Sequence, residues 1–183
     1  GGFSSHTPGV TYQWEKSDNG GAVWNTLGGA TSASYTTGLT TYADDHNDQY
    51  RCVISAVGAA SPATTNAVIL TVQRTFQITS QPTNANGEEG GTASFTVATS
   101  SSSGTVTYQW ERSDDGGANY VPVSGATNAT YITPTLVFAN DNADRYRAVA
   151  SLVDAAADIT STHGELTVLR VISIQTQPNS TAV

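Results

Sequence analysis

Cysteine and lysine are almost absent from this chain, with Cys52 and Lys16 as the single examples of each. One cysteine excludes any disulfide within the chain. The 7 basic residues are outnumbered by 15 acidic ones, for a formal charge of −8. Nucleic-acid binding needs a basic surface that displaces counterions from phosphates, so this charge balance argues against nucleic acid as a partner. It also disfavours anionic membrane surfaces.

Long apolar runs and the usual catalytic patterns are missing as well. No stretch of 18 apolar residues occurs, so we expect no membrane insertion. The three histidines, His6, His46 and His163, have no counterparts in the internal repeat described below. No nucleophile–base pair, metal-ligand spacing or phosphate-binding loop stands out. The sequence therefore predicts a protein that is not an enzyme and has no cofactor or catalytic residue.

What the chain does have is a long internal repeat. The stretch at 11–21 returns at 107–117, and Asp48–Arg51 returns as Asp144–Arg147, both at an offset of 96 residues. A period this long gives each unit enough residues to bury its own core, unlike a short solenoid repeat. We therefore expect a first domain at 1–73 that lacks the opening of the repeat, and a complete second domain at 74–169. Residues 170–183 would open a third repeat in a longer array, or supply a strand to a neighbouring molecule.

Period-two alternation indicates that the units are built from strands. Val10, Tyr12 and Trp14 alternate with polar residues, and a turn rich in Asp, Asn and Gly follows them. No stretch shows helical periodicity. Short strands at regular intervals with Gly, Asn and Asp turns are typical of an all-β sandwich. Further strands are expected at 23–27, 33–37, 49–55, 67–72 and 90–97.

Two sequence features resemble immunoglobulin-like domains of the kind found in bacteriophage virion proteins and bacterial surface proteins. Trp14 and Trp110 match the core Trp on strand C of that fold. Tyr50 precedes Cys52 by two residues, like the Tyr of the tyrosine corner, and Tyr146 stands in the same place before Ala148. The resemblance implies tandem immunoglobulin-like β-sandwiches without a disulfide. It also implies that the structural core includes Trp14, Tyr50, Cys52, Trp110 and Tyr146, and that the first domain lacks most of strands A and B.

Clustered carboxylates before the second-to-last strand of each unit form one candidate site. Calcium takes six to eight oxygen ligands, and such oxygens gather at 44–48 and 140–144. The alternative is that these side chains bond to the backbone and build the turn itself. The calcium candidates are Asp44, Asp45, Asp48, Asp141 and Asp144.

Trp24 and Tyr120 occupy equivalent positions after the hairpin and are candidates for contact with a ligand or partner. Exposed aromatic rings stack on sugars and anchor interfaces. The alternative is packing in the core or at a sheet edge, since the alternation around Val23 and Leu27 leaves their direction open.

The resemblance implies a structural or display protein on a virion or cell surface, such as a capsid decoration, a tail or fibre component, or a surface filament. Such a protein would mediate assembly and weak multivalent adhesion. Its partners would be other copies of itself, other structural proteins, and cell-surface glycans. Its location would be extracellular. A dedicated carbohydrate- or receptor-binding module is the second hypothesis.

Overall fold

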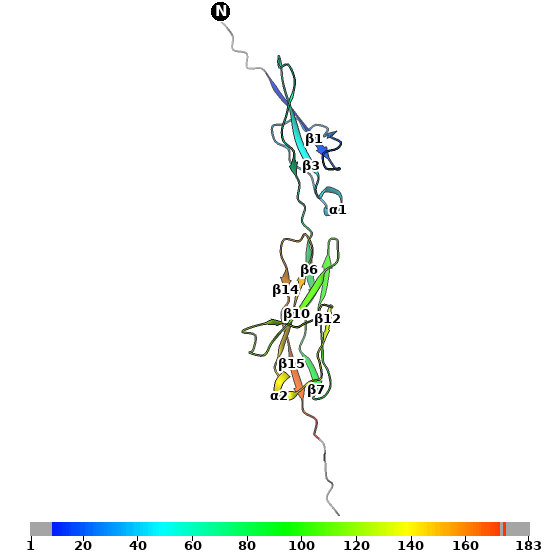
Figure 1. Cartoon of the computed structure of the whole chain (residues 1–183), viewed down its shortest axis with the longest axis vertical. Coiled ribbons are helices and arrows are strands. Elements are labelled where there is room, and N and C mark those ends of the chain that lie inside the picture. Colours follow the sequence, from blue (N-terminus) through cyan, green and yellow to red (C-terminus); the bar gives the residue numbers. More distant parts are fainter. Residues whose placement is uncertain (1–8, 173, 175–183) are drawn as a thin grey trace, which may run out of the picture. The chain divides into compact units, whose positions relative to one another are not determined.

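The computed structural model describes residues 9–172 and 174, and the chain divides into two compact units. Unit 1 comprises Gly1–Gln73 and unit 2 comprises Arg74–Val183. Figure 1 shows the strands of both units, coloured along the sequence. The strand that residues 170–183 were expected to supply falls largely outside the described residues.

Unit 1 contains one sheet within its described part. Its two long strands are β1 (Val10–Ser17) and β3 (Gln49–Ala56), which pair antiparallel over their whole length with Trp14 opposite Cys52. The sheet order is β2-β1-β3-β4, and β5 also pairs with β3. The remaining elements are β2 (Asn25–Thr26), α1 (Tyr42–Asp45), β4 (Ala63–Thr64) and β5 (Val68–Ile69).

Unit 2 repeats this sheet and adds a second layer. β10 (Thr107–Ser113) and β13 (Arg145–Ser151) pair with Trp110 opposite Ala148, as β1 and β3 do in unit 1. The larger sheet has the order β11-β10-β13-β15-β7, with β14 on β13 and a parallel pairing of β15 with β7. The second layer consists of the pairs β12–β8 and β6–β9. The remaining elements are β6 (Phe76–Ser80), β7 (Ala85–Glu88), β8 (Ser94–Thr96), β9 (Ala98–Ser101), β11 (Val121–Pro122), β12 (Thr130–Ile132), α2 (Phe138–Asp141), β14 (Ile159–Thr160) and β15 (Gly164–Leu169).

The core of unit 2 lies between its two layers and is organised by aromatic rings. Trp110 is 0% exposed and its indole N–H donates to the backbone oxygen of Asn128 at 2.8 Å. Phe95, from the second layer, stacks on Tyr146 with ring centroids 4.8 Å apart. Tyr131 bridges the rings of Trp110 and Tyr146 at 6.1 and 5.3 Å. Ring pairs at these centroid distances stabilise the fold by about 0.5–1.5 kcal/mol each, in addition to the hydrophobic contribution of the area that they bury.

The inner face of unit 1 keeps part of this ring system. Tyr35 lies 6.1 Å from Trp14 and 5.8 Å from Tyr50, as Tyr131 does from its two partners. Cys52 is buried and carries a free thiol. Trp14 is only partly buried, whereas Trp110 is fully buried.

The strands expected from alternation are real but several are shorter than predicted. The expected strands at 23–27 and 67–72 shrink to Asn25–Thr26 and Val68–Ile69, because only these residues pair with a neighbouring strand. Residues 33–37 form no strand, although the equivalent residues of unit 2 include β12, which pairs with β8. A single helical turn, α1 or α2, also precedes β3 and β13 in the two units. Four residues are too few to produce a helical period that a sequence could reveal.

Replacing Trp110 by Ala should destabilise unit 2 by about 3–5 kcal/mol, because a fully buried large ring is lost and leaves a cavity. Chemical denaturation followed by far-UV circular dichroism would measure this loss. Ile132→Ala is the matched control in the same unit, since that side chain is 63% exposed and should change stability by less than about 0.5 kcal/mol. Equal effects of the two substitutions would refute the assignment of Trp110 to the core.

Candidate functional site

The first repeated surface feature combines an aromatic ring, an arginine and a glutamate on the outer face of each larger sheet. In unit 1, Glu15 and Arg51 are directly opposite each other on β1 and β3, and their side chains form an ion pair at 2.7 Å. The Arg51 guanidinium lies 4.1 Å from the centre of the Trp24 ring. Residues alternate in direction along a strand, so Arg51 points away from the face that buries Tyr50 and Cys52. Trp24 therefore packs on the outside of the sheet.

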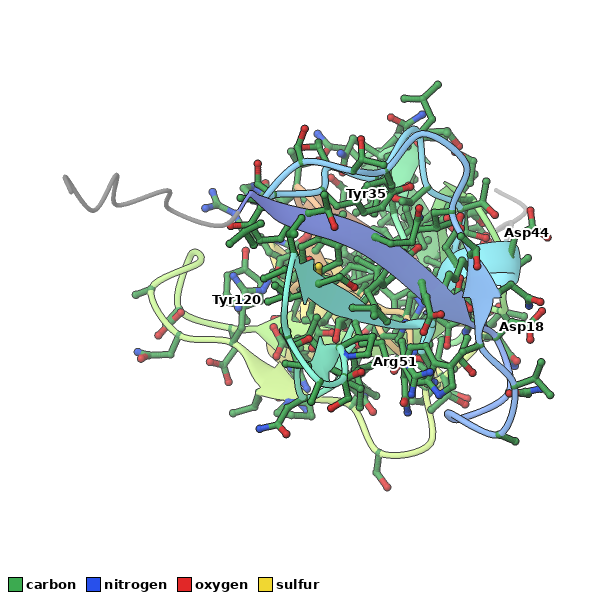
Figure 2. All side chains as sticks on the ribbon, turned by 90° about the horizontal axis from the view of Figure 1, so that it is seen from above. Asp18, Tyr35, Asp44, Arg51 and Tyr120 are labelled. Atoms are coloured by element: carbon green, nitrogen blue, oxygen red, sulfur yellow. The ribbon has the colours of Figure 1, made fainter. Side chains whose placement is uncertain are left out.

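Unit 2 has the same arrangement with tyrosine in place of tryptophan. Glu111 and Arg147 pair across β10 and β13 at 2.7 Å, and the Arg147 guanidinium lies 3.8 Å from the centre of the Tyr120 ring. Figure 2 labels Arg51 and Tyr120, one member of each set. We refer to these two sets, Glu15–Arg51–Trp24 and Glu111–Arg147–Tyr120, as the outer aromatic sites.

Each outer aromatic site is positioned by a tight hairpin turn. In unit 1 the hydroxyl of Ser17 accepts from the Gly21 amide at 2.9 Å and donates to the side-chain oxygen of Asn19 at 2.9 Å. That same oxygen accepts from the Val23 amide at 2.8 Å. Gly21 has φ +90°, and a Cβ added there would lie 3.6 Å from the Trp24 ring. Only glycine fits this conformation without strain. The turn therefore fixes the position of the Trp24 ring relative to the sheet.

The turn of unit 2 makes the same bonds through a carboxylate. Asp115 replaces Asn19, and its Oδ1 accepts from the Ser113 hydroxyl at 2.7 Å and from the Asn119 amide at 2.9 Å. The hydrogen bond from the Asn119 backbone is the main reason that the pKa of Asp115 is held below its usual range, and the Ser113 and Asn119 side chains add to the effect. The two turns are thus equivalent in geometry and differ in charge.

The carboxylates proposed for calcium in unit 1 make the contacts of a capped turn. Thr41 is the N-cap of α1, and its hydroxyl accepts from the Asp44 amide at 3.2 Å. Asp45 accepts from the Thr41 amide at 2.8 Å, and this bond is the main cause that lowers the Asp45 pKa. Lys16 reaches Asp48 at 2.5 Å and Asp45 at 3.3 Å. Figure 2 shows Asp44 on the single helical turn and Asp18 at the hairpin that follows β1.

In unit 2, arginine replaces this lysine. Arg112 pairs with the buried Asp144 at 2.5 Å and lies 3.6 Å from Asp141. Burial raises the pKa of Asp144, against the opposing effect of Arg112.

Among residues 9–172 and 174, no three His, Cys, Asp or Glu side chains are grouped in a way that could hold a metal ion. The contacts seen at 44–48 and 140–144 are those of the turn-building alternative.

A hollow of about 280 Å³ opens beside this ion pair in unit 2, between β11 and β12. Arg112 and Asp141 lie on its polar side, and Val121, Pro134 and Tyr131 supply apolar walls. No local sequence pattern indicates this hollow, because it forms where two short strands from different layers leave a gap.

The sequence pointed to the two rings of the outer aromatic sites but not to their partners. Arg51, Arg147, Glu15 and Glu111 could have been found from two signals: they repeat at 96 residues and occupy outward positions of neighbouring strands. The cross-strand register that makes them neighbours was not available from the sequence.

His46 accepts from the Val72 amide at 3.2 Å and stacks on Tyr42, which is a local packing role.

The fold defines the class of protein: a tandem of immunoglobulin-like β-sandwiches without a disulfide, as the sequence predicted. Among solved structures, three N-terminal domains of the bacteriophage RB49 Highly Immunogenic Outer Capsid protein (Hoc) are similar at 15% identity, with a TM-score of 0.50. The match covers 90% of this chain and 59% of that one. A mutated variant of titin domains I67–I69 is similar at 13% identity with a TM-score of 0.52, covering 89% of this chain and 56% of that one.

The chain belongs to a family described as a domain of unknown function (DUF8696). The family's sequence model matches it twice, over residues 3–74 and 81–170. The chain spans less than two thirds of the length of the Hoc and titin structures. No curated protein sequence matches it significantly. None of the helices in the described ranges is long and apolar enough to cross a membrane.

Acidification should loosen the turn of unit 2 and leave the turn of unit 1 unchanged. A carboxylate whose pKa is lowered by folding stabilises the folded state above its unfolded pKa, which is about 4. This stabilisation is lost as the pH falls through the lower, folded pKa. Amide hydrogen exchange at Gly117 and Asn119, compared with Gly21 and Val23, would measure the effect below about pH 4.

The matched variant is Asp115→Asn, which copies the amide of Asn19 at the equivalent position. It should remove the pH dependence at Gly117 and Asn119 while preserving the turn. Similar acid sensitivity of both turns in the parent chain would contradict the assignment to Asp115.

Proposed function

We propose that the chain is a non-enzymatic structural and display element of a virion or cell surface, which works without a cofactor. The outer aromatic site, present once in each unit, is the observation that carries the proposal. In both units these rings lie on the face of the sheet opposite to the inner aromatic residues, so they are not part of the cores. The likeness to domains of an outer capsid protein supports a surface location through the fold alone.

The mechanism that we propose is repeated weak contact. Trp, Tyr and Arg are the residues that contribute most to binding at protein surfaces. Each site offers one ring, one guanidinium and one carboxylate, and the ion pair leaves no net charge on the pair. A single site of this size gives modest affinity, and linked sites raise it by making later contacts intramolecular. The repeated sites would serve assembly with other copies or with other surface proteins. They would also serve adhesion to the outside of a cell.

Immunogold electron microscopy would test the proposed location. Antibodies raised against the full chain should label the outer surface of intact particles or intact cells from the source, without permeabilisation. Pre-absorption of the antibody with the purified chain is the control and should abolish the signal. Labelling that appears only after permeabilisation would contradict a display role.

A dedicated carbohydrate-binding module is the alternative, and the outward position of Trp24 and Tyr120 favours it. Aromatic faces stack on the apolar faces of sugars, and a fixed Arg–Glu pair offers donors and acceptors to neighbouring hydroxyls. The absence of net charge on that pair suits a neutral glycan better than a phosphate-rich or strongly charged one. On this hypothesis the isolated chain binds saturably to one sugar class.

Binding to immobilised neutral hexose and N-acetylhexosamine oligosaccharides would separate the two functions. Trp24→Ala and Tyr120→Ala should each weaken glycan binding about 10-fold or more, since a good aromatic anchor contributes over 1 kcal/mol. The double variant should lose binding entirely. Val23→Ala is the matched control, because Val23 is exposed beside Trp24 and lies outside the site. No saturable binding by the parent chain would exclude the carbohydrate module and leave the display role standing.

A further inference from the structure

The turn of unit 1 contains a chemical feature that neither proposed function uses. Asn19 is followed by Gly20 at the exposed tip of the hairpin, and Gly20 has φ +71°. The positive φ values of this turn fall on Gly20 and Gly21 and not on Asn19, because glycine adopts such angles without steric cost. Asn-Gly is also the dipeptide in which glycine offers least steric resistance to attack by its own amide nitrogen on the preceding side chain.

We infer that Asn19 is a site of spontaneous deamidation in the folded protein. In this reaction the Gly20 backbone nitrogen loses its proton and attacks Cγ of Asn19, and the side-chain nitrogen leaves as ammonia. The product is a five-membered succinimide. Water then opens this ring at one of its two carbonyls, which gives aspartate or isoaspartate. Water is the only co-reactant, and no oxidant or reductant takes part.

The hydrogen bonds of the turn favour the first step. The side-chain oxygen of Asn19 accepts from the Ser17 hydroxyl and from the Val23 amide, at 2.9 and 2.8 Å. Two donors on a carbonyl oxygen stabilise the negative charge that develops there when a nucleophile adds to the carbon, which is the principle of an oxyanion hole. The Gly20 amide donates none of the hydrogen bonds found among the described residues, so its nitrogen is not held by another acceptor.

Unit 2 shows that the aspartate product fits the turn. Asp115 occupies the equivalent position, followed by Gly116, and accepts from Ser113 and Asn119 as Asn19 does from Ser17 and Val23. Deamidation to aspartate would therefore give unit 1 the acidic turn that unit 2 already has, with one more negative charge at the tip. Isoaspartate instead adds a methylene group to the backbone and would displace Gly21, against which the Trp24 ring lies.

The chain contains an internal control with the same dipeptide. Asn86 and Gly87 lie within β7, which pairs with β15 in a parallel ladder. Gly87 is buried, and a Cβ placed on it would overlap the Leu136 side chain. The surrounding strands hold this backbone extended and resist the bending that a five-membered ring requires. Asn86 should therefore react far more slowly than Asn19, although the two share the same sequence neighbour.

Peptide mapping by mass spectrometry of the full native chain, incubated at mildly alkaline pH, tests the inference. We expect aspartate and isoaspartate to accumulate at Asn19 at least about 10-fold faster than at Asn86, which corresponds to a barrier difference of about 1.4 kcal/mol. Full unfolding in denaturant should bring the two rates together, since sequence context is then the same. Conversion of Asn19 at a rate equal to or below that of Asn86 in the native chain would overturn the inference.

Two variants connect the chemistry to the turn. Asn19→Asp should fold with the same thermal midpoint as the parent and show no further change in charge at this position. Ser17→Ala removes one donor to the Asn19 oxygen, and should slow deamidation at Asn19 if the turn assists the reaction. Equal or faster conversion in Ser17→Ala, with the fold intact by circular dichroism, would refute the role given to the turn.

Discussion

The packing of one tyrosine between two other aromatic residues is the contact on which each unit depends. Tyr131 in unit 2, and Tyr35 in unit 1, fix the distance between the core tryptophan and the tyrosine of the long central strand. In unit 2 the second layer adds Phe95, and Phe95, Trp110 and Tyr146 are buried. Because there is no disulfide to join the layers, this packing has to hold them together. The outer aromatic sites lie on the opposite face of the strands that carry these rings.

The outer aromatic sites follow from the same two strands. Alternation along a strand places every second side chain on the outer face, so the residues that flank Tyr50 and Tyr146 point outward. Arg51 and Arg147 occupy those positions and meet a glutamate across the ladder. The hairpin then folds back and lays an aromatic ring on the guanidinium. Consecutive residues, Tyr50 and Arg51 in unit 1 and Tyr146 and Arg147 in unit 2, therefore make a core contact and a surface contact.

Much of this organisation could be predicted from the sequence, because a 96-residue period and the spacing of Trp14, Tyr50 and Cys52 are properties of the chain alone. The immunoglobulin-like fold was predicted and is confirmed. The residues around Trp24 do not alternate cleanly, so the sequence leaves its direction open; in the structure its ring packs on Arg51, on the outer face of the sheet. The hollow beside Arg112 and the lengths of the edge strands depend on contacts between distant segments. Such contacts leave no local pattern.

The inner and outer rings differ in how well they are shielded from solvent, and the hydrogen exchange of the three indole N–H groups measures this difference directly. Trp110 is fully buried and its N–H is bonded to Asn128, so it should exchange slowest in an NMR experiment on the folded chain. Trp14 bonds to Ser32 but is only partly buried, and it should be intermediate. Trp24 lies on the outer face and should exchange fastest. Protection of Trp24 equal to that of Trp110 would place its ring in a core and contradict this description of both surfaces.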